Sequence, residues 1–368
     1  MNKSLLALAV AAALPTLAQA QTTVTVSGII KTGVQSVKLS NAAVAADNGN
    51  SMAVNDGSSR FIIAGSEDLG GGLRATFQVD TRLRPDEGTG TVAGGNSWVG
   101  LAGGFGQIRL GRLDQYYGLG TDQHGARATA LTASSISVLS YIGGATGATA
   151  AAVANASRTA NLIRWDSANI AGFTAGLGYS TAYATPEGGV GAPGKGAALS
   201  ADLAYAKGPL TAGLGYWDAK DEPKANGQKG LRVAASMNVA MLNVGLTVDQ
   251  SSISTGLGTA GAVENKRTAY SIPVRMSLGA GTLMVTYSVA QNIKANGSTV
   301  SNSGAKFITA GYDYPLSKRT SIGLSYANMN NDSGAAYALF TGNALHNIPV
   351  PKVGQDTQQI HLGLRHAF

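Results

Sequence analysis

The 368-residue chain contains no cysteine and few charged residues. Without cysteine it forms no disulfide or thiolate metal cluster, which is compatible with export through an oxidising compartment. Charged residues make up only 13% of the chain, and no run of five or more Lys or Arg occurs. This argues against a basic tail that binds nucleic acid. After residue 20 no stretch approaches the roughly 18 apolar residues of a spanning helix, so a helical membrane protein is excluded.

Residues 1–20 are typical of a secretory signal peptide. Lys3 precedes an apolar run from Leu5 to Leu14, and Ala18-Gln19-Ala20 offers small residues on both sides of a cleavage site. A membrane anchor is the alternative, but the apolar run is short and is broken at Pro15. The sequence therefore predicts cleavage after Ala20, which leaves residues 21–368 as a single exported domain.

From Thr23 to the end, apolar and polar residues alternate in short segments. The last segment alternates Ile360, Leu362 and Leu364 with polar or small residues and ends at Phe368. A period of two predicts strands with one apolar and one polar face. We predict about sixteen such strands, near residues 23–38, 58–67, 72–84, 96–102, 106–112, 158–168, 172–183, 197–206, 209–219, 229–240, 241–251, 265–278, 281–293, 304–314, 318–328 and 357–368.

The connections between these segments alternate between short and long. The short ones, such as 67–72 and 278–281, are rich in Gly or Pro, as tight turns require. The long ones include 113–157 and 329–356. Short turns on one rim and long loops on the other are the layout of an outer-membrane barrel. In a soluble β-sandwich apolar and polar residues would also alternate along the strands, but nothing would require short and long loops to alternate. In a membrane, moreover, only a closed barrel leaves no strand edge unpaired.

The polar faces of the predicted strands carry more cations than carboxylates. A charge that faces lipid at mid-depth costs about 2–4 kcal/mol, so these side chains must face water. Sixteen strands leave an aqueous channel that they can line. Arg112 falls on the apolar parity unless a bulge near Gly111 turns it inward. Strict parity places on the polar face the cations Lys31, Arg60, Arg74, Arg82, Arg109, Arg164, Arg232, Arg275 and Arg365 and the acids Asp80, Asp202, Asp249 and Asp313.

Several stretches resemble the trimeric general porins of Gram-negative bacteria, and most closely their betaproteobacterial branch. Residues 59–73 are similar to the second strand and first periplasmic turn of that family, and residues 98–112 to its fourth and fifth strands. Residues 163–167, 316–320 and 363–368 are similar in the same order. The resemblance extends over essentially the whole mature chain.

The resemblance implies an all-β fold. The expected architecture is a 16-stranded antiparallel transmembrane β-barrel with short periplasmic turns, long extracellular loops and a third loop, near 113–157, that folds inward. In this family basic residues on the barrel wall face acids on that loop. By motif position Arg60, Arg112 and Arg164 match the wall cluster, and Lys31 adds to it; Arg74 and Arg109 extend the predicted pore lining.

The loop itself is poor in carboxylates. Asp114 and Asp122 are the only acids between residues 113 and 157, and the Pro-Glu-Phe-Gly-Gly signature of the family's loop is absent. The constriction is therefore expected to be more uniformly positive than in cation-preferring relatives. The terminal Phe368 matches the aromatic residue that the barrel-assembly machinery reads in this family.

Catalytic signatures are missing. None of the four histidines belongs to an H-E-x-x-H or H-x-x-E-H pattern, and no G-x-S-x-G elbow or phosphate-binding loop occurs. Barrel enzymes of outer membranes need a Ser/His pair at the lipid boundary, where His366 is the candidate. We predict that the chain is not an enzyme and uses no cofactor or metal.

The predicted function is that of an outer-membrane porin, through which small hydrophilic solutes and ions diffuse passively with a preference for anions. A substrate-specific channel of the same fold for small organic anions is the first alternative, and it needs more lumenal aromatic steps than Trp98 and Trp217 offer. A structural or adhesive barrel is the second, and the length of the chain opposes it. The expected partners are two further copies in a homotrimer, outer-membrane lipid and lipopolysaccharide, the barrel-assembly machinery, and small hydrophilic solutes and anions.

Overall fold

The computed structural model describes residues 23–116, 119–120, 128–142, 151–152, 158–183, 196–220, 226–340 and 348–368. The predicted signal peptide, Asp122 and two of the histidines, His124 and His346, lie outside these ranges. Within them, no helix has the length and apolar character needed to cross a membrane.

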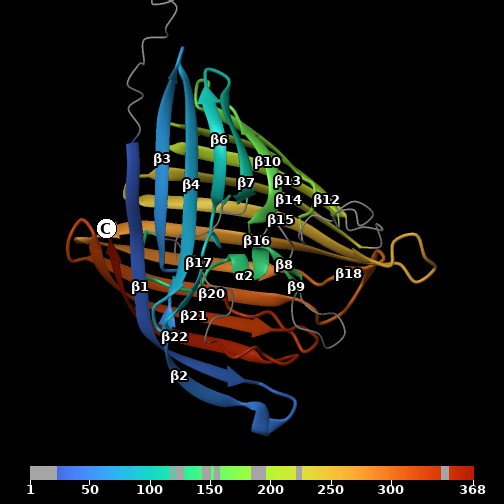
Figure 1. Ribbon diagram of the computed structural model, residues 1–368. Coiled ribbons are helices and arrows are strands. Elements are labelled where there is room, and N and C mark those ends of the chain that lie inside the picture. The colour runs from blue at the N-terminus through green and yellow to red at the C-terminus, as the bar shows by residue number, and fades with distance from the viewer. Residues whose placement is uncertain are drawn as a thin grey trace, which may run out of the picture.

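Sixteen antiparallel strands close into a barrel, which confirms the predicted fold (Figure 1). Each pairs with its neighbour in sequence, and the first strand pairs with the last from Ile29 opposite Ala367 to Ser40 opposite Asp356. The strands of the barrel are β1 (Thr23–Ser40), β3 (Arg60–Gly70), β4 (Leu73–Arg84), β6 (Ser97–Gly103), β7 (Gly106–Leu113), β10 (Thr159–Asp166), β11 (Phe173–Ser180), β12 (Ala197–Lys207), β13 (Leu210–Lys220), β14 (Gly227–Val239), β15 (Leu242–Thr255), β16 (Val263–Leu278), β17 (Gly281–Ala290), β20 (Ala305–Pro315), β21 (Thr320–Asn331) and β22 (Asp356–Ala367).

Short elements also form inside connections that the sequence predicted as loops. β2 (Gly49–Asp56) pairs with the second half of β1, where β3 no longer reaches. The others are the 3-10 helix η1 (Ala45–Asp47), the strands β5 (Thr89–Thr91), β8 (Tyr141–Ile142), β9 (Ala151–Ala152), β18 (Lys294–Ala295) and β19 (Ser298–Thr299), and the four-residue helix α2 (Ile136–Leu139).

Burial alternates along the strands with the predicted period of two. On β14, Leu231 and Val233 are 42% and 49% exposed, whereas Arg232 between them is fully buried. Apolar side chains thus point outward, where lipid lies in a membrane, and polar ones point into the barrel. Because consecutive strands are antiparallel, all short turns lie at one rim with the two ends of the barrel domain, and the long connections lie at the other.

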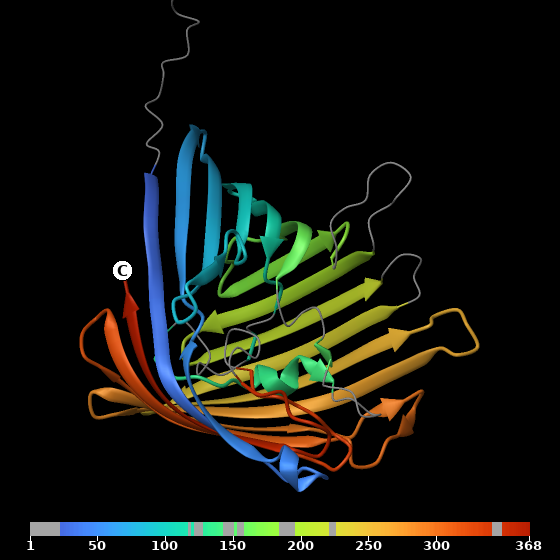
Figure 2. The same ribbon diagram turned by 60° about the horizontal axis from the view of Figure 1, so that its bottom comes forward.

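The third long connection, between β7 and β10, enters the barrel instead of covering its mouth (Figure 2). We call residues 114–158 the constriction loop. Its segment around Ala130, Leu131 and Leu139 is fully buried. There it packs with residues of the connection between β21 and β22 against the inner faces of β20 and β21, in an apolar core that includes Val138, Phe307, Met329 and Tyr337. The predicted inward fold of this loop is confirmed.

Candidate pore constriction

The constriction loop first follows the inner face of β10 to β15. Gln115 accepts a hydrogen bond from Arg164 Nη1 at 3.0 Å and another from the Ser200 hydroxyl. Further on, the carbonyl oxygen of Gly120 accepts a hydrogen bond from Thr247 Oγ1 at 2.6 Å. Several strands therefore set the path of the loop, because each contributes one polar contact to it.

The loop then contacts the opposite wall, where glycines allow a close approach. The amide of Ala130 donates to Asp313 Oδ1 at 2.7 Å. A Cβ atom built on Gly311 or Gly323 would lie 2.9 or 2.8 Å from Leu131, and one on Gly363 would overlap the carbonyl oxygen of Ala130. Real Cβ atoms do not come so near. A side chain at Gly363 would therefore displace the loop backbone, whereas one at Gly311 or Gly323 would first displace the terminal methyl groups of Leu131.

A cationic cluster lies on the wall formed by β1, β3 and β4. Arg60 Nη1 and Arg82 Nε lie 3.5 and 3.3 Å from the two carboxylate oxygens of Asp80, and both arginines also donate to Ser58 Oγ. Lys31 is fully buried beside them, and its electrostatic neighbours include Arg60 and the carboxylate of Asp56. We define the cationic cluster as the cations Lys31, Arg60 and Arg82 with the carboxylates Asp56 and Asp80.

The surroundings of the cationic cluster do not cancel its excess of positive charge. Asp313 and Arg365 also act on Lys31, with one charge of each sign. The side chain of Arg82 is 16% exposed and that of Arg60 8%, so Arg82 has more contact with solvent than Arg60 has. Charge in a narrow site with low-dielectric walls focuses its field into the solvent path, even where the charged atoms are largely covered.

A second cluster, on β7, β10 and β12, is balanced. Arg109 forms an ion pair with Asp166, and Arg164 lies 2.8 Å from both Asp166 and Asp202. The guanidinium of Arg109 also lies over the ring of Trp98, 5.3 Å from its centroid. We call the two arginines and two aspartates the paired cluster, in which each cation has a carboxylate of its own.

A third group binds the constriction loop directly. Arg232 on β14 and Arg267 on β16 flank Asp249 on β15, at 2.9 and 3.1 Å. The same two arginines donate to the carbonyl oxygen of Leu139, the last residue of α2. We call Arg232, Asp249 and Arg267 the loop clamp.

The predicted pore-lining residues are thus distributed over different places. Lys31 and Arg60 lie in the cationic cluster, and Arg109 and Arg164 in the paired cluster. Arg74 is exposed near the start of β4, opposite Asp68, and so lies at the mouth beside the first short turn.

Arg112 differs from its predicted setting in one respect. It pairs with Ser97, and the irregularity in the ladder lies in β10, between Thr159 and Leu162, rather than at Gly111. The charged groups that act on Arg112 are Arg158 and Asp114. The structure therefore shows no bulge at Gly111 that would turn this side chain inward.

Of the two predicted loop acids, Asp114 lies among the described residues, and its hydrogen-bond partner is Asn96 rather than a wall arginine. Asp114 accepts a hydrogen bond from Asn96 Nδ2 at 2.8 Å, and its own amide donates to Asn96 Oδ1. The neutral Gln115 is the neighbouring loop residue that reaches Arg164. Asp122 lies outside the described residues, so its predicted place at the constriction stays a prediction.

Three charged residues of these clusters, Asp56, Asp166 and Arg267, were missed at the sequence level, and so was the loop residue Gln115. Asp56 lies in a stretch that the sequence predicts as a long loop. Asp166 shares the parity of Arg164, and Arg267 shares that of Arg275, so both could have been assigned to the polar face. Gln115 carries no charge and stands outside any alternating pattern, so the sequence offers no signal for it.

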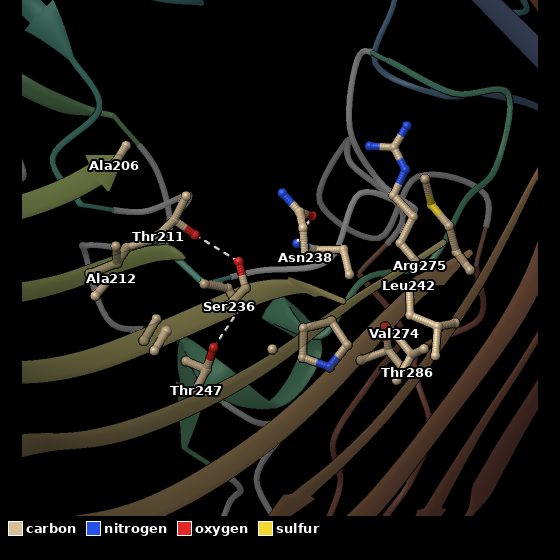
Figure 3. Close-up of a pocket in the computed structure, with 18 of the residues that line it drawn as sticks. Ala206, Thr211, Ala212, Ser236, Asn238, Leu242, Thr247, Val274, Arg275 and Thr286 are labelled. Carbon is tan, nitrogen blue, oxygen red and sulfur yellow. Dashed lines mark hydrogen bonds between the residues drawn. The ribbon is translucent and has the colours of Figure 1, made fainter. Parts of the chain in front are cut away.

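A cavity of about 630 Å³ with both polar and apolar lining residues opens in the barrel beside Leu119 and Gly120 of the constriction loop. Its lining includes Ser236, Asn238 and Arg275 (Figure 3). The hydroxyls of Thr211 and Ser236 are hydrogen-bonded at 2.7 Å. The cavity lies toward the rim of the short turns, since Ala240 and Met241 of the turn between β14 and β15 also line it.

A closed barrel of sixteen strands whose interior is crossed by an inward loop and lined by arginines has the architecture of a bacterial outer-membrane channel. Residues 7–334 match the family model described as Gram-negative porin, and the chain belongs to that family. It is therefore a multi-pass β-barrel of the Gram-negative outer membrane that forms a passive channel.

Relatives and solved structures agree with this assignment. Outer membrane porin protein 32 of Delftia acidovorans is 30% identical over 381 aligned residues that cover the whole of both chains. Major outer membrane protein P.IB of Neisseria meningitidis serogroup B is 43% identical over 119 residues, which cover 31% of this chain and 34% of that one. The anion-selective porin from Comamonas acidovorans superposes with a TM-score of 0.75 at 26% identity, covering 95% of this chain and all of that one.

Proposed function

We propose that the chain forms a water-filled channel for small hydrophilic solutes and ions, and that the channel prefers anions. The observation that carries the preference is that Arg60 and Arg82 share the single carboxylate of Asp80. With Lys31 beside them and Asp56 as the second carboxylate, cations outnumber carboxylates in this cluster. Rings of Arg or Lys produce anion selectivity in pores because they raise the local concentration of counter-ions. The structural similarity to the anion-selective porin from Comamonas acidovorans supports the same sign.

The wall residues have graded roles in this proposal. Lys31, Arg60 and Arg82 supply the excess charge, whereas Arg109 and Arg164 chiefly order the wall because carboxylates compensate them. Arg74 contributes from the mouth. Arg112, at the end of β7 beside Asp114, contributes through the charge balance of the loop end. Asp114 and Asp122 moderate the positive field from the loop.

The preference is measured as the reversal potential of a planar bilayer under a gradient of potassium chloride. The expected sign at low salt is that of an anion-selective channel. At the same ratio of salt concentrations, the reversal potential should be smaller at molar salt, where the screening length falls to about 3 Å. A channel that passes potassium in preference to chloride at low salt would overturn the anion preference and leave the barrel untouched.

A substrate-specific channel for small organic anions is the second candidate. The cavity lined by Asn238 and Arg275 favours it, since amide and guanidinium donors bind carboxylates. Liposome swelling separates the two candidates: a general porin admits sugars and organic acids according to size, whereas a specific channel admits the acids far faster than sugars of equal size. Transport rather than catalysis is the proposed role under either candidate, and His366 contacts the hydroxyl of Thr320 rather than a serine.

Assembly completes the proposal. We propose a homotrimer in outer-membrane lipid and lipopolysaccharide, formed after cleavage of residues 1–20 and insertion by the barrel-assembly machinery. Phe368 lies at the closing seam, where its backbone and that of Gly28 exchange two hydrogen bonds, and its side chain is 47% exposed. Deletion of Phe368 should sharply reduce the heat-modifiable oligomer seen by gel electrophoresis in mild detergent. A normal amount of that oligomer in the deletion variant would remove the assembly role, and a wild-type barrel that stays monomeric would remove the trimer.

A further inference from the structure

Two lysines stand directly opposite each other on the outer surface of the barrel, at the rim of the long connections. Lys266 belongs to β16, and its ladder partner Lys294 belongs to β18, which lies far from the C-terminus (Figure 1). Arg267, the next residue of β16, is buried inside the barrel, so Lys266 points outward, and ladder partners share one face of the sheet. Their Cβ atoms are about 4.5–5.5 Å apart in such a pair. We call Lys266 and Lys294 the lysine pair.

The charge of the lysine pair is not compensated by an ion pair. Among the described residues, neither lysine forms an ion pair or a side-chain hydrogen bond. Glu264 lies on the same face of β16, two residues nearer the connection, and within that part of the chain it pairs with neither lysine. By contrast, Lys229 on β14 has the carboxylate of Asp218 at 3.9 Å. Like charges directly opposite in a sheet are destabilising, so an anion between the two ammonium groups would remove this cost.

Hydroxyl groups flank the lysine pair on both sides. Ser252 on β15 is the ladder partner of Lys266, and Thr299 on β19 is that of Lys294. Neighbouring strands lie about 4.8 Å apart, so this row of four donor side chains extends over about 14 Å. Each lysine offers three N–H donors, and a phosphate monoester offers three acceptor oxygens with nearly two negative charges. The row therefore fits a phosphate group that contacts both ammonium groups at once.

The depth of the lysine pair in the membrane indicates a lipid as the source of the phosphate. Tyr270 and Ile272 follow Lys266 on the outward face of β16, and Tyr287 stands opposite Ile272 on β17. Aromatic residues of a membrane barrel lie at the interface between hydrocarbon and headgroups. Lys266 is four residues beyond Tyr270, about 13 Å along the tilted strand, toward the rim that faces the outer leaflet. The ammonium groups thus lie at the level of the headgroups and outside the lumen.

We propose that the lysine pair binds a phosphate group of lipopolysaccharide, and so holds one molecule of this lipid against β15 to β19. Two ammonium groups bind the phosphate directly, so the contact needs no divalent cation to bridge it. The inference rests on the proposed place of the channel in lipopolysaccharide, and it adds a specific lipid site outside the lumen.

The test is a titration of the folded oligomer with lipopolysaccharide in mild detergent, followed by native mass spectrometry. EDTA is present throughout, so divalent cations do not contribute. Lys266→Gln and Lys294→Gln should each weaken the tightest binding step by about fivefold, and the double variant should weaken it by about thirtyfold. Lipopolysaccharide from which the phosphates have been removed should bind the wild type as weakly as intact lipopolysaccharide binds the double variant.

Three further variants separate charge at this site from other effects. Lys266→Arg combined with Lys294→Arg keeps both charges and should bind within about twofold of the wild type. Glu264→Gln removes a carboxylate from the same face of β16 and should tighten binding severalfold. Lys207→Gln is the matched control, because it removes an exposed lysine at the end of β12, on the rim of the short turns. It should leave lipid binding as in the wild type. The heat-modifiable oligomer reports whether each variant has folded.

Each outcome decides for or against the site. Binding within twofold of the wild type in the double glutamine variant would overturn the proposal, and so would equal binding of dephosphorylated lipopolysaccharide. If inorganic phosphate displaces the lipid at equal concentration, the lysine pair binds free phosphate and the lipid assignment fails. Should the double variant form no oligomer, Glu264→Gln decides, and unchanged binding there would overturn the site.

The proposed channel function is tested separately. The double glutamine variant should keep the wild-type reversal potential, because the lysine pair lies outside the lumen. A wild-type barrel that carries no current would remove the proposed function, and the lipid titration would still test the lysine pair.

Discussion

Two arginine clusters on the same barrel wall differ in the number of carboxylates that accompany them. In the cationic cluster Arg60 and Arg82 share Asp80, whereas in the paired cluster Arg109 and Arg164 are matched by Asp166 and Asp202. The guanidinium groups are chemically the same in both places. Their different roles follow from the neighbouring strands, which supply enough acids to compensate the charge in one cluster and too few in the other.

This difference predicts where selectivity is determined. A cation with its own carboxylate presents a dipole, whose field falls off faster with distance than that of a net charge. Ion selectivity should therefore respond to the charge balance of a cluster rather than to the number of arginines in it. The following substitutions test that comparison through the reversal potential at low salt.

The largest shift is expected from Arg60→Gln combined with Arg82→Gln. This double variant leaves Lys31 to face Asp56 and Asp80, so the excess of the cationic cluster changes sign and the anion preference should be lost or reversed. Lys229→Gln is the control, because it removes positive charge at an exposed site paired with Asp218 rather than in the cluster. An anion preference that survives the double variant unchanged would place selectivity elsewhere.

A smaller shift of opposite sign is expected from Asp80→Asn. The substitution removes the one carboxylate that both arginines share, so the positive excess of the cluster doubles from one charge to two and the anion preference should increase. The comparison variant is Asp218→Asn, which removes an acid that pairs with the exposed Lys229. A fall in anion preference on removing Asp80 would show that this carboxylate holds the arginines in place more than it neutralises them.

The smallest shift is expected from neutralising an ion pair within the paired cluster. Arg164→Gln combined with Asp202→Asn leaves the net charge unchanged, so the reversal potential should stay at the wild-type value within scatter. The free energy of unfolding should fall by about 1–3 kcal/mol, because a partly buried charged hydrogen bond is lost. Urea denaturation of the folded barrel measures the second quantity. A clear change of selectivity in this variant would contradict the idea that balanced charges do not select.

Much of the fold could be predicted because a strand with one lipid-facing side shows its orientation locally. Leu231, Arg232 and Val233 identify the inner and outer faces of β14 without reference to any other residue. The predicted segments agree closely with the strands of the barrel for the same reason. The pairing of β2 with β1 was not predictable, since it depends on where β3 ends relative to its neighbour.

Ion-pair partners on different strands could not be predicted from the local sequence pattern. Arg164 and Asp202 are 38 residues apart in the sequence, and only the relative register of the strands between them brings the two together. Parity alone assigns a face but neither a depth nor a partner, which is why Arg60 and Arg164 looked equivalent. Gln115 was unpredictable because the path of a loop depends on contacts with many strands at once.

The three wall glycines beneath the loop have a consequence for how such channels diversify. Because Gly311, Gly323 and Gly363 place no side chain between wall and loop, a methyl group at Gly363 would meet the backbone of Ala130 and require the loop to move. At Gly311 or Gly323 it would first meet the terminal methyl groups of Leu131. The bore could then narrow while every charged residue stays the same. The width of the passage and its charge thus depend on different residues, so a substitution can change one and leave the other as it is.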